Sequence, residues 1–377
     1  MFFKNARIFC SDIQFHTGAF EVPEDGRFGQ ILPQDIPSDA VDLHGATVIP
    51  GLIDVHNHGN SGADFSDGDY QGLETMAKYL AKNGITGFAP ASMTLPYEVL
   101  EKAFATAKQL VDNQPQGCAR LLGIQMEGPY FSEKKKGAQN GAYLKTPDFV
   151  GFEKLYRDCG GLVKIVDVAP ELPGAEEFVK QASKLCTVSI AHTDSDYDHA
   201  KAAIAAGVTH LTHLFNAMPA INHRNPGVIP AAAEASQVRA ELICDGHHIH
   251  QAVVRLAFAM FGADRMILVS DALRCCGMPD GEYELGGQQV FLQGGVAKLA
   301  DGTLAGSSTN LYDCMRVAMS FGIPEEDAIR AASYNPACSL GVQDVTGCIA
   351  QGNYADFIVC TDNYAAKQVY LNGQPLN

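Results

Sequence analysis

Eight apolar runs of strand length recur through the middle of the chain, and a segment with helical spacing or composition follows each of them. The runs cover residues 47–55, 85–91, 120–126, 162–168, 187–191, 208–214, 240–244 and 266–269. The clearest helical segments are 73–82, 97–111, 175–185, 197–206 and 251–261. Strands in which apolar residues follow one another, without polar residues at every second position, are typical of a parallel sheet that helices bury on both faces. Eight such units in about 290 residues predict an α/β protein with a (β/α)8 barrel. The alternative is an open doubly wound sheet, but no glycine-rich phosphate fingerprint follows the first strand.

The two ends of the chain differ from this middle part. Residues 1–45 and 345–376 carry short alternating runs that turn-forming residues interrupt, which predicts β-structure at both ends. We therefore expect a small β-sandwich domain that residues 1–48 and 345–377 build together, beside a barrel domain over 49–344.

Local signals refine this picture. The segment 281–305 contains Gly-Gly and Asp-Gly pairs, which predict a hairpin inserted after the eighth strand. Asp196 precedes the fourth of the helical segments, and Ser307 or Ser308 precedes a further one at 311–320. Because aspartate and serine are favoured at helix N-termini, we expect them to cap these two helices.

The composition restricts the partners and the compartment. The 27 Lys and Arg residues against 43 Asp and Glu give a net charge of −16, which disfavours nucleic acid and anionic membranes as partners. No run approaches the ~18 apolar residues of a membrane span, and the first residues lack the apolar region and cleavage site of a signal peptide. The eleven cysteines form no Cys-x-x-Cys pair, which is typical of reduced thiols. We expect a cytoplasmic enzyme that acts on a small molecule.

Side chains that can bind metal or transfer protons gather where the predicted strands end. In a barrel the carboxyl ends of all strands lie at one rim, and active sites form there. The residues at these positions are Asp54, His56, His58, Glu127, His192, His213, Asp245, His248 and Asp271. Strand alternation turns His210 away from the face of His213, and it allows only one of His247 and His248 to point inward.

The residue types at this rim predict a divalent metal site. His56 and His58 are two positions apart, so they share one face of a strand, although two half-buried structural histidines would give the same motif. Glu127 follows an apolar run, where a carboxylate is costly to bury unless it is paired or bound to metal. His192 and His213 could each be a core histidine, but four imidazoles with two carboxylates favour a metal. We expect Zn²⁺, with Fe²⁺ or another divalent ion as the alternative.

These segments resemble those of a known family. Residues 50–58, Pro-Gly-Leu-Ile-Asp-Val-His-Asn-His, are similar to the first-strand signature of the amidohydrolase superfamily. Residues 126–130 (Met-Glu-Gly-Pro-Tyr), 212–219 (Thr-His-Leu-Phe-Asn-Ala-Met-Pro) and 304–308 (Leu-Ala-Gly-Ser-Ser) resemble the N-acetylglucosamine-6-phosphate deacetylases within it. The similarity runs in order over nearly the whole chain.

The resemblance implies a fold, a reaction and a set of roles. The fold is a (β/α)8 barrel with a small β-sandwich, and the reaction is hydrolysis of the N-acetyl amide of N-acetyl-D-glucosamine 6-phosphate. Glu127, His192 and His213 would hold the principal divalent metal. Asp271 would be the catalytic acid and base, and His248 would polarise the acetyl carbonyl. Some members lack the two histidines of the first strand, so one or two ions are implied here, with Glu127 as the bridge to His56 and His58.

The same resemblance implies how a phosphorylated amino sugar is bound. Arg224 would bind the 6-phosphate, from the neighbouring subunit of a homodimer. The other positions that match substrate-binding segments are Ala138, Gln139, Asn216, Ala217, His248, Leu304, Ala305 and Gly306. Members often carry histidine where this chain has Gln139, which bears on the selection among sugar epimers.

Other functions fit part of the pattern. A ring-opening amidohydrolase would use a carbamylated lysine from the fourth strand, but Lys164 is near the start of that strand. A nucleobase deaminase would use the two first-strand histidines and Asp271, yet it gives Arg224 no role. A barrel that serves only as a scaffold would lack some of the metal ligands, whereas every expected ligand is present.

Overall fold

A curled parallel sheet forms the centre of the structure, which is a computed structural model that describes residues 1–365 and 367–376. Three strands pair in the order β5 (Leu52–Asn57), β8 (Ile85–Pro90) and β9 (Arg120–Leu121). Six more pair in the order β10 (Ile124–Met126), β11 (Val163–Val168), β12 (Thr187–Ile190), β13 (Val208–Leu211), β14 (Arg239–Ile243) and β15 (Met266–Val269). All pairs within both groups are parallel, as the unalternating apolar runs predict.

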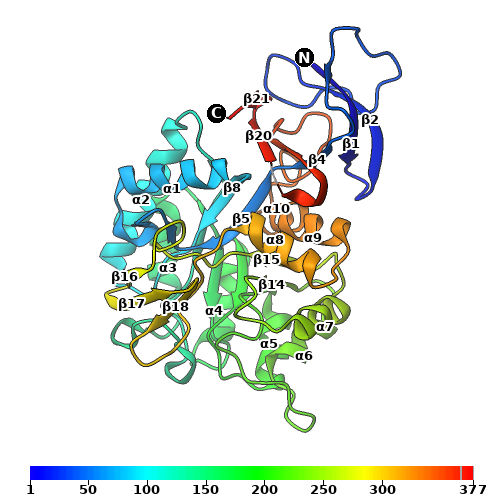
Figure 1. Ribbon diagram of the computed structural model, residues 1–377. Coiled ribbons are helices and arrows are strands. Elements are labelled where there is room, and N and C mark those ends of the chain that lie inside the picture. Colours follow the sequence, from blue (N-terminus) through cyan, green and yellow to red (C-terminus); the bar gives the residue numbers. More distant parts are fainter. Residues whose placement is uncertain (366, 377) are drawn as a thin grey trace.

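Backbone contacts link the two groups of strands on both sides. A bridge between Ala91 and Gln125 connects the end of β8 to β10. On the other side, the amide of Asp271 donates to the carbonyl of His56 at 2.9 Å, just beyond β15. The sheet therefore curves back towards its own first strand (Figure 1).

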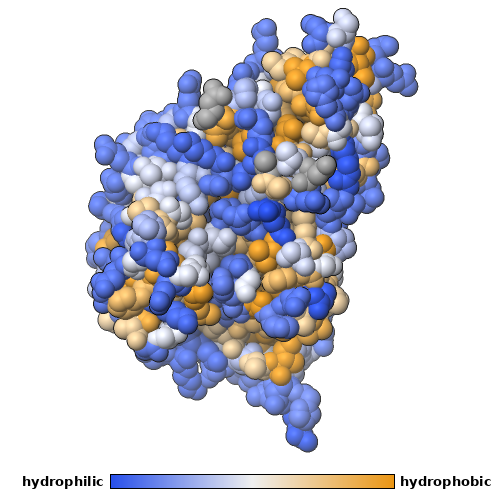
Figure 2. Space-filling view, in the orientation of Figure 1, coloured by the Kyte–Doolittle hydropathy of each residue, from blue (hydrophilic) through white to orange (hydrophobic). Residues whose placement is uncertain are grey.

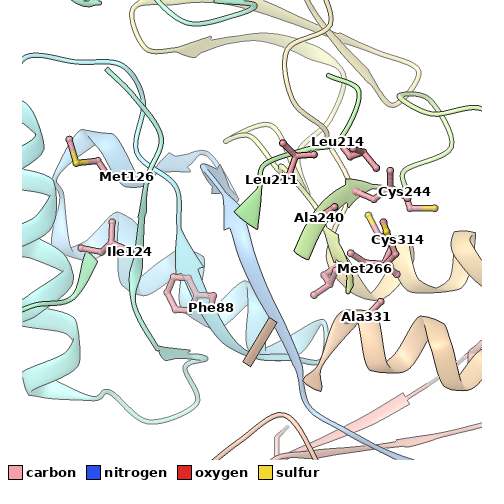
Figure 3. Close-up of a cluster of buried hydrophobic side chains, with 14 of the residues drawn as sticks. Phe88, Ile124, Met126, Leu211, Leu214, Ala240, Cys244, Met266, Cys314 and Ala331 are labelled. Atoms are coloured by element: carbon pink, nitrogen blue, oxygen red, sulfur yellow. The ribbon is translucent and has the colours of Figure 1, made fainter. Parts of the chain in front are cut away.

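Helices cover the outside of this sheet (Figure 1). They are α1 (Tyr70–Lys82), α2 (Tyr97–Asn113), α3 (Phe149–Asp158), α4 (Ala175–Ala182), α5 (Tyr197–Ala206), α6 (Val228–Glu234), α7 (Gln251–Phe261), α8 (Leu311–Ser320), α9 (Glu325–Ala332) and α10 (Tyr334–Leu340). In α1 the buried residues Leu73, Met76, Ala77 and Leu80 recur at the spacing that gives one apolar face. The largest apolar core lies between such faces and the strands, and Figure 3 shows part of it, including Phe88 and Ile124.

The first apolar run, 47–55, divides between two sheets rather than forming one strand. Its first part is β4 (Thr47–Pro50), which joins the terminal strands, and its second part is β5 of the parallel sheet. Gly51 separates them, and a Cβ atom there would lie 2.0 Å from Oγ1 of Thr86. The strand therefore changes partners where only glycine leaves room for the side chain of Thr86.

Both ends of the chain are β-structure, as their alternating runs predict. They form one seven-stranded sheet in the order β2 (Phe15–Glu21), β1 (Phe2–Phe9), β4, β19 (Phe357–Cys360), β20 (Lys367–Leu371) and β21 (Gln374–Pro375), with β3 (Val41–Asp42) beside β1. Phe3, Phe20 and Phe357 pack with ring centroids 4.9–5.3 Å apart in a separate small core. The two termini therefore lie at the same end of the molecule (Figure 1).

The expected insertion after the eighth strand is present but larger than a hairpin. It is a three-stranded antiparallel sheet of β16 (Gly281–Leu285), β17 (Gln288–Gln293) and β18 (Val296–Leu299). A second small ribbon pairs β6 (Gly59–Asn60) with β7 (Ala63–Asp64). Four short 3₁₀ helices complete the elements: η1 (Phe65–Asp67), η2 (Glu133–Lys135), η3 (Gly141–Tyr143) and η4 (Asp362–Tyr364).

One predicted helix cap is confirmed and one is wrong. The side chain of Asp196 accepts from the amide of His199 and caps α5. Helix α8 is capped by Asn310, whose side chain accepts from the amide of Asp313, and not by Ser307 or Ser308. The two serine hydroxyls donate instead to the carbonyls of Ser270 and Gly295. The N-cap is the residue directly before the first helical residue, and Asn310 holds that position before Leu311, whereas the two serines come two and three residues earlier.

Hydrophilic residues cover most of the face that Figure 2 shows, and apolar residues are scattered among them. Within the described residues, no helix has both the length and the apolar character that crossing a membrane requires.

Candidate metal centre and active site

A pocket lies where the parallel strands end, and most of the predicted site residues line it. Its polar wall comprises His58, Glu127, Gln139, His192, His213, Asn216, His248, Asp271 and Thr303. Its remaining wall comprises Met93, Gly137, Ala138, Ala217, Ile243, Leu273, Leu285, Leu304 and Gly306. The strand ends thus bring together side chains that are up to about 200 residues apart in the sequence, as expected for the carboxyl rim of a parallel sheet.

Three of these residues converge on one point. Oε1 of Glu127 lies 3.2 Å from Nε2 of His192 and 3.1 Å from Nε2 of His213, and the two nitrogens are 3.1 Å apart. All three side chains are buried. His192 and His213 have φ angles of 44° and 33°, a region that non-glycine residues seldom adopt. Such backbone strain is typical of functional sites, where the surrounding fold holds it in place.

Hydrogen-bond acceptors of His192 and Glu127 face each other in this cluster. Nδ1 of His192 donates to the carbonyl oxygen of Lys135 at 2.8 Å, so Nε2 of a neutral ring carries a lone pair. That lone pair points at a carboxylate oxygen of Glu127, which is also an acceptor. The arrangement is repulsive unless a cation lies between them or the ring gains a second proton. The donor set fits a divalent ion bound by one carboxylate and two imidazoles.

A second group of ligands shares Glu127 with the first. His56, His58 and Glu127 form it. Nδ1 of His58 donates to the carbonyl oxygen of Ala91, and its Nε2 lies 3.3 Å from both Glu127 Oε2 and Asp271 Oδ1. Nε2 of His56 is buried and has no hydrogen-bond partner in the described part of the chain. It lies 3.6 Å from carboxylate oxygens of Glu127 and Asp271, so groups that can accept a hydrogen bond again face one another, an arrangement that suits a cation.

The electrostatics of the cluster favour bound positive charge. Burial raises the pKa of Glu127, but the neighbouring histidines outweigh this and hold it well below its ordinary value. Burial lowers the pKa of His56, but Glu241 and Glu127 outweigh this and raise it to about 10. Among the described residues, no lysine or arginine pairs with Glu127, Glu241 or Asp271. Since buried carboxylates need compensating charge, a divalent cation fits this site.

Asp271 and His248 face the pocket from neighbouring strand ends. Burial raises the pKa of Asp271, but hydrogen bonding to His58 and the nearby imidazoles lower it below its ordinary value. His248 is held by Asp245, whose Oδ2 accepts from Nδ1 of the ring at 2.8 Å. His247 is exposed, so only one of the two adjacent histidines points inward, as predicted.

Most of the residues that the family resemblance implies for sugar binding lie at the pocket. Ala138, Asn216, Ala217, Leu304 and Gly306 line the pocket, whereas Ala305 is fully buried and is not part of the wall. Gln139 is also buried: its Nε2 donates to Glu127 Oε2 at 2.8 Å, and its Oε1 accepts from the amide of Thr94 at 2.7 Å.

Arg224, which the family resemblance implies for phosphate binding, does not line the pocket. Arg224 is exposed in the segment that precedes α6, and this segment projects from the bottom of the molecule in Figure 1. Within the described residues the guanidinium of Arg224 has no hydrogen bond or ion pair, and only its backbone amide donates, to Oδ1 of Asn222. No lysine or arginine of the described chain lines the pocket.

Sequence reasoning missed Glu241 and misjudged His210. Glu241 is fully buried in β14, and its two oxygens lie 2.9 Å from His56 Nδ1 and 2.9 Å from His210 Nε2. His210 therefore points into the same polar cluster as His213, whose amide also donates to Glu241. The signal was present, because Glu241 is a carboxylate inside an apolar strand run, as Glu127 is at the end of one.

Comparisons with known proteins agree with this geometry. A model of the amidohydrolase family matches residues 47–376. An N-acetylglucosamine-6-phosphate deacetylase from Vibrio furnissii is 35% identical over 94% of this chain and 89% of its own length. One from Bacillus subtilis is 34% identical over 96% and 90%, and an N-acetylgalactosamine-6-phosphate deacetylase from Escherichia coli O157:H7 is 31% identical over 93% and 92%.

Solved structures give the same result. One is a mutant of N-acetyl-D-glucosamine-6-phosphate deacetylase from Mycobacterium smegmatis in complex with N-acetyl-D-glucosamine-6-phosphate. It superposes with a TM-score of 0.93 at 30% identity, and the match covers 100% of this chain and 99% of that one. The enzyme from Pasteurella multocida gives 0.92 at 28% identity, covering 99% and 98%. The chain therefore belongs to the amidohydrolase family, in the group of N-acetylglucosamine-6-phosphate deacetylases that its sequence resembles.

Proposed function

We propose that this protein is a metal-dependent hydrolase that converts N-acetyl-D-glucosamine 6-phosphate to D-glucosamine 6-phosphate and acetate, in amino-sugar catabolism. The observation that carries this proposal is the convergence of Glu127, His192 and His213 with Asp271 and His248 around one pocket. The relatives with the same printed activity, at 33–35% identity over most of the chain, support the choice of substrate.

The proposed architecture is a closed (β/α)8 barrel over residues 49–344, with a small β-sandwich domain formed by 1–48 and 345–377. The backbone hydrogen bonds from Asp271 to His56 and from His58 to Ala272 support closure between the last and first strands. A separate aromatic core around Phe3 supports the division into domains.

The principal divalent ion, for which we propose Zn²⁺ with Fe²⁺ as the alternative, would be held by Glu127, His192 and His213. A second ion would be held by His56 and His58, with Glu127 as the bridge. When bound, such an ion lowers the pKa of a bound water to about 7 and polarises a carbonyl oxygen.

The protein's own groups would supply the proton transfers. Asp271, ionised beside the two first-strand histidines, takes a proton from the attacking water and later gives it to the leaving amine. Burial lowers the pKa of His248, but Asp245 outweighs this and raises it, so the doubly protonated ring, held in one orientation by Asp245, donates from Nε2 to the acetyl oxygen as negative charge develops there. The buried side of the pocket excludes bulk water, which strengthens both interactions.

The phosphate is proposed to bind Arg224 of a second copy of the chain, in a homodimer. Two observations support this: the described pocket wall has no lysine or arginine, and the Arg224 side chain is exposed and unpaired. A phosphate dianion needs charge-assisted donors, which a guanidinium provides in a planar fork. Ala138, Gln139, Asn216, Ala217, Leu304 and Gly306 would surround the sugar, with the buried Ala305 behind them. The eleven cysteines are all unpaired, which supports a cytoplasmic location.

A second candidate substrate is N-acetyl-D-galactosamine 6-phosphate, the 4-epimer. Gln139 bears on the choice between the epimers, because members of the family that the sequence resembles often carry histidine at this position, whereas here the Gln139 side chain is committed to Glu127 and Thr94. The galactosamine enzyme of E. coli O157:H7, at 31% identity, is a further reason to test it.

The decisive experiment measures acetate release by the purified protein from both epimers and from unphosphorylated N-acetylglucosamine, with ring opening of dihydroorotate and ammonia release from adenosine as controls for the other reactions. We expect the highest kcat/KM for N-acetyl-D-glucosamine 6-phosphate and no turnover of the controls. A higher kcat/KM for the galactosamine epimer would select the second candidate. Absence of acetate from either sugar phosphate would reject the proposed function.

A further inference from the structure

We propose that Glu241 is a positioning residue. Its carboxylate fixes the ring of His56 for the second divalent ion, and through His210 it connects that ring to helix α10. The proposal rests on the proposed function, because it concerns the same metal centre. Glu241 touches neither the pocket nor the substrate-binding wall, so it would act only through other side chains.

The geometry is a continuous set of hydrogen bonds from α10 to the centre. Oγ of Ser339, in α10, lies 3.3 Å from Nδ1 of His210. Nε2 of His210 donates to Oε1 of Glu241 at 2.9 Å, and Nδ1 of His56 donates to Oε2 of Glu241 at 2.9 Å. The side chains of Glu241, His56 and His210 are each 0% exposed.

The carboxylate decides which nitrogen of His56 can bind metal. A carboxylate can only accept, so both imidazoles must turn an N–H towards it. His56 therefore carries its proton on Nδ1, and its Nε2 lone pair lies 3.6 Å from the carboxylate oxygens of Glu127 and Asp271. This is the arrangement in which an outer carboxylate orients a ligand histidine and makes it more basic.

A carboxylate suits this position better than an amide would. Glutamine has only one accepting oxygen, so its NH₂ group would face one of the two imidazole N–H groups. The negative charge also has no lysine or arginine partner among the described residues. One divalent ion carries less positive charge than the negative charge of the three buried carboxylates of Glu127, Asp271 and Glu241, so a second ion or a protonated histidine would complete the balance.

The test compares metal binding by the wild-type protein and Glu241→Gln, loaded with Zn²⁺ and titrated against a chelator, with bound metal counted by elemental analysis. Asp167→Asn is the matched control: Asp167 is equally buried in β11, but its partners are Gln125 and Thr212 and it contacts no ligand. We expect two ions in the wild type and the control, and a second ion bound about 10- to 100-fold more weakly in Glu241→Gln. The principal ion should stay.

Each other outcome has a definite meaning. Equal affinity for two ions in Glu241→Gln would overturn the proposal, and so would a wild type that holds one ion. If that one-ion protein still releases acetate from the sugar phosphate, the proposed function stands. Loss of both ions in Glu241→Gln would mean that Glu241 supports His213 through its backbone amide, and the role assigned to His56 would be wrong. If Glu241→Gln does not fold, Glu241→Asp replaces it: this side chain is too short to span two imidazoles and should also weaken the second ion.

Discussion

The metal end and the phosphate end of the pocket are built in opposite ways. At the metal end, Glu127 is 2% exposed, and Nδ1 of His56, His58 and His192 is hydrogen-bonded within the same chain. At the other end, the described wall has no cationic side chain, and Arg224 lies exposed on a projecting loop. One chain thus brings together the groups for amide hydrolysis, whereas its described pocket wall has no cationic side chain for a phosphate, which is the reason for proposing a contribution from a second copy. Changes at the two ends should therefore have different signatures.

The largest effect is expected at the principal ligands. Glu127→Ala or His192→Ala removes one of three protein ligands, so the remaining site is unsaturated and weak. Both activity and bound metal should be lost, on every substrate alike. The control is His44→Ala, a histidine with an 85% exposed side chain. A stoichiometric ion in either ligand variant, counted by elemental analysis, would show that the centre is elsewhere.

Asp271→Asn should separate chemistry from metal binding. Asparagine keeps the shape and can still form hydrogen bonds, but it cannot exchange a proton at neutral pH. We expect turnover to be abolished while the principal ion remains. Retention of more than about a tenth of the wild-type kcat would contradict the acid and base role of Asp271.

Arg224→Ala should have an intermediate effect that depends on the substrate. Charge-assisted bonds to a charged group are worth roughly 1.5–3 kcal/mol. We therefore expect kcat/KM for N-acetyl-D-glucosamine 6-phosphate to fall by about tenfold to several hundredfold, with little change for the unphosphorylated sugar. Arg157→Ala, on the surface of α3 and paired with Glu153, should change neither. Parallel losses on both sugars would rule out a phosphate role.

A mixing experiment sharpens the same comparison. Arg224→Ala and Asp271→Asn each disable a different end of the pocket. If Arg224 acts across a homodimer, a hybrid of the two variants has one complete site. Co-refolded equal mixtures should then recover roughly a quarter of wild-type activity on the sugar phosphate. No recovery, with hybrids demonstrated by tags, would mean that Arg224 does not act in the other subunit.

The smallest effect is expected at the first-strand pair. The double variant His56→Asn with His58→Asn removes the second group of ligands but leaves Glu127, His192 and His213 in place. Activity should fall less than in Glu127→Ala, and the principal ion should remain bound. If activity and metal vanish as completely as in Glu127→Ala, the two histidines belong to the essential site.

The sequence was sufficient where a local pattern had one structural outcome. Continuous apolar runs that end in polar residues located the strand ends, so Glu127, His192 and Asp271 were found without knowledge of the contacts between them. Helix α5, with its cap at Asp196, was predicted with both its ends.

The remaining features depend on contacts between distant segments. The run 47–55 contains no local signal that its two parts belong to different sheets, because that change depends on the close approach of the Thr86 side chain to Gly51. Ser307 and Ser308 look like caps until the first residue of α8 is known to be Leu311, which makes Asn310 the N-cap. Glu241 was passed over because its partners, His56 and His210, come from other strands.

The central claim is that a divalent metal held at the strand ends is required for hydrolysis of the sugar-phosphate amide. The direct measurement is acetate release from N-acetyl-D-glucosamine 6-phosphate by protein stripped of metal with a chelator and then titrated with Zn²⁺ or Fe²⁺. We predict no release by the stripped protein and recovery as the first equivalent of metal binds per chain. Full activity in metal-free protein, or no acetate from the reloaded and folded protein, would contradict the claim.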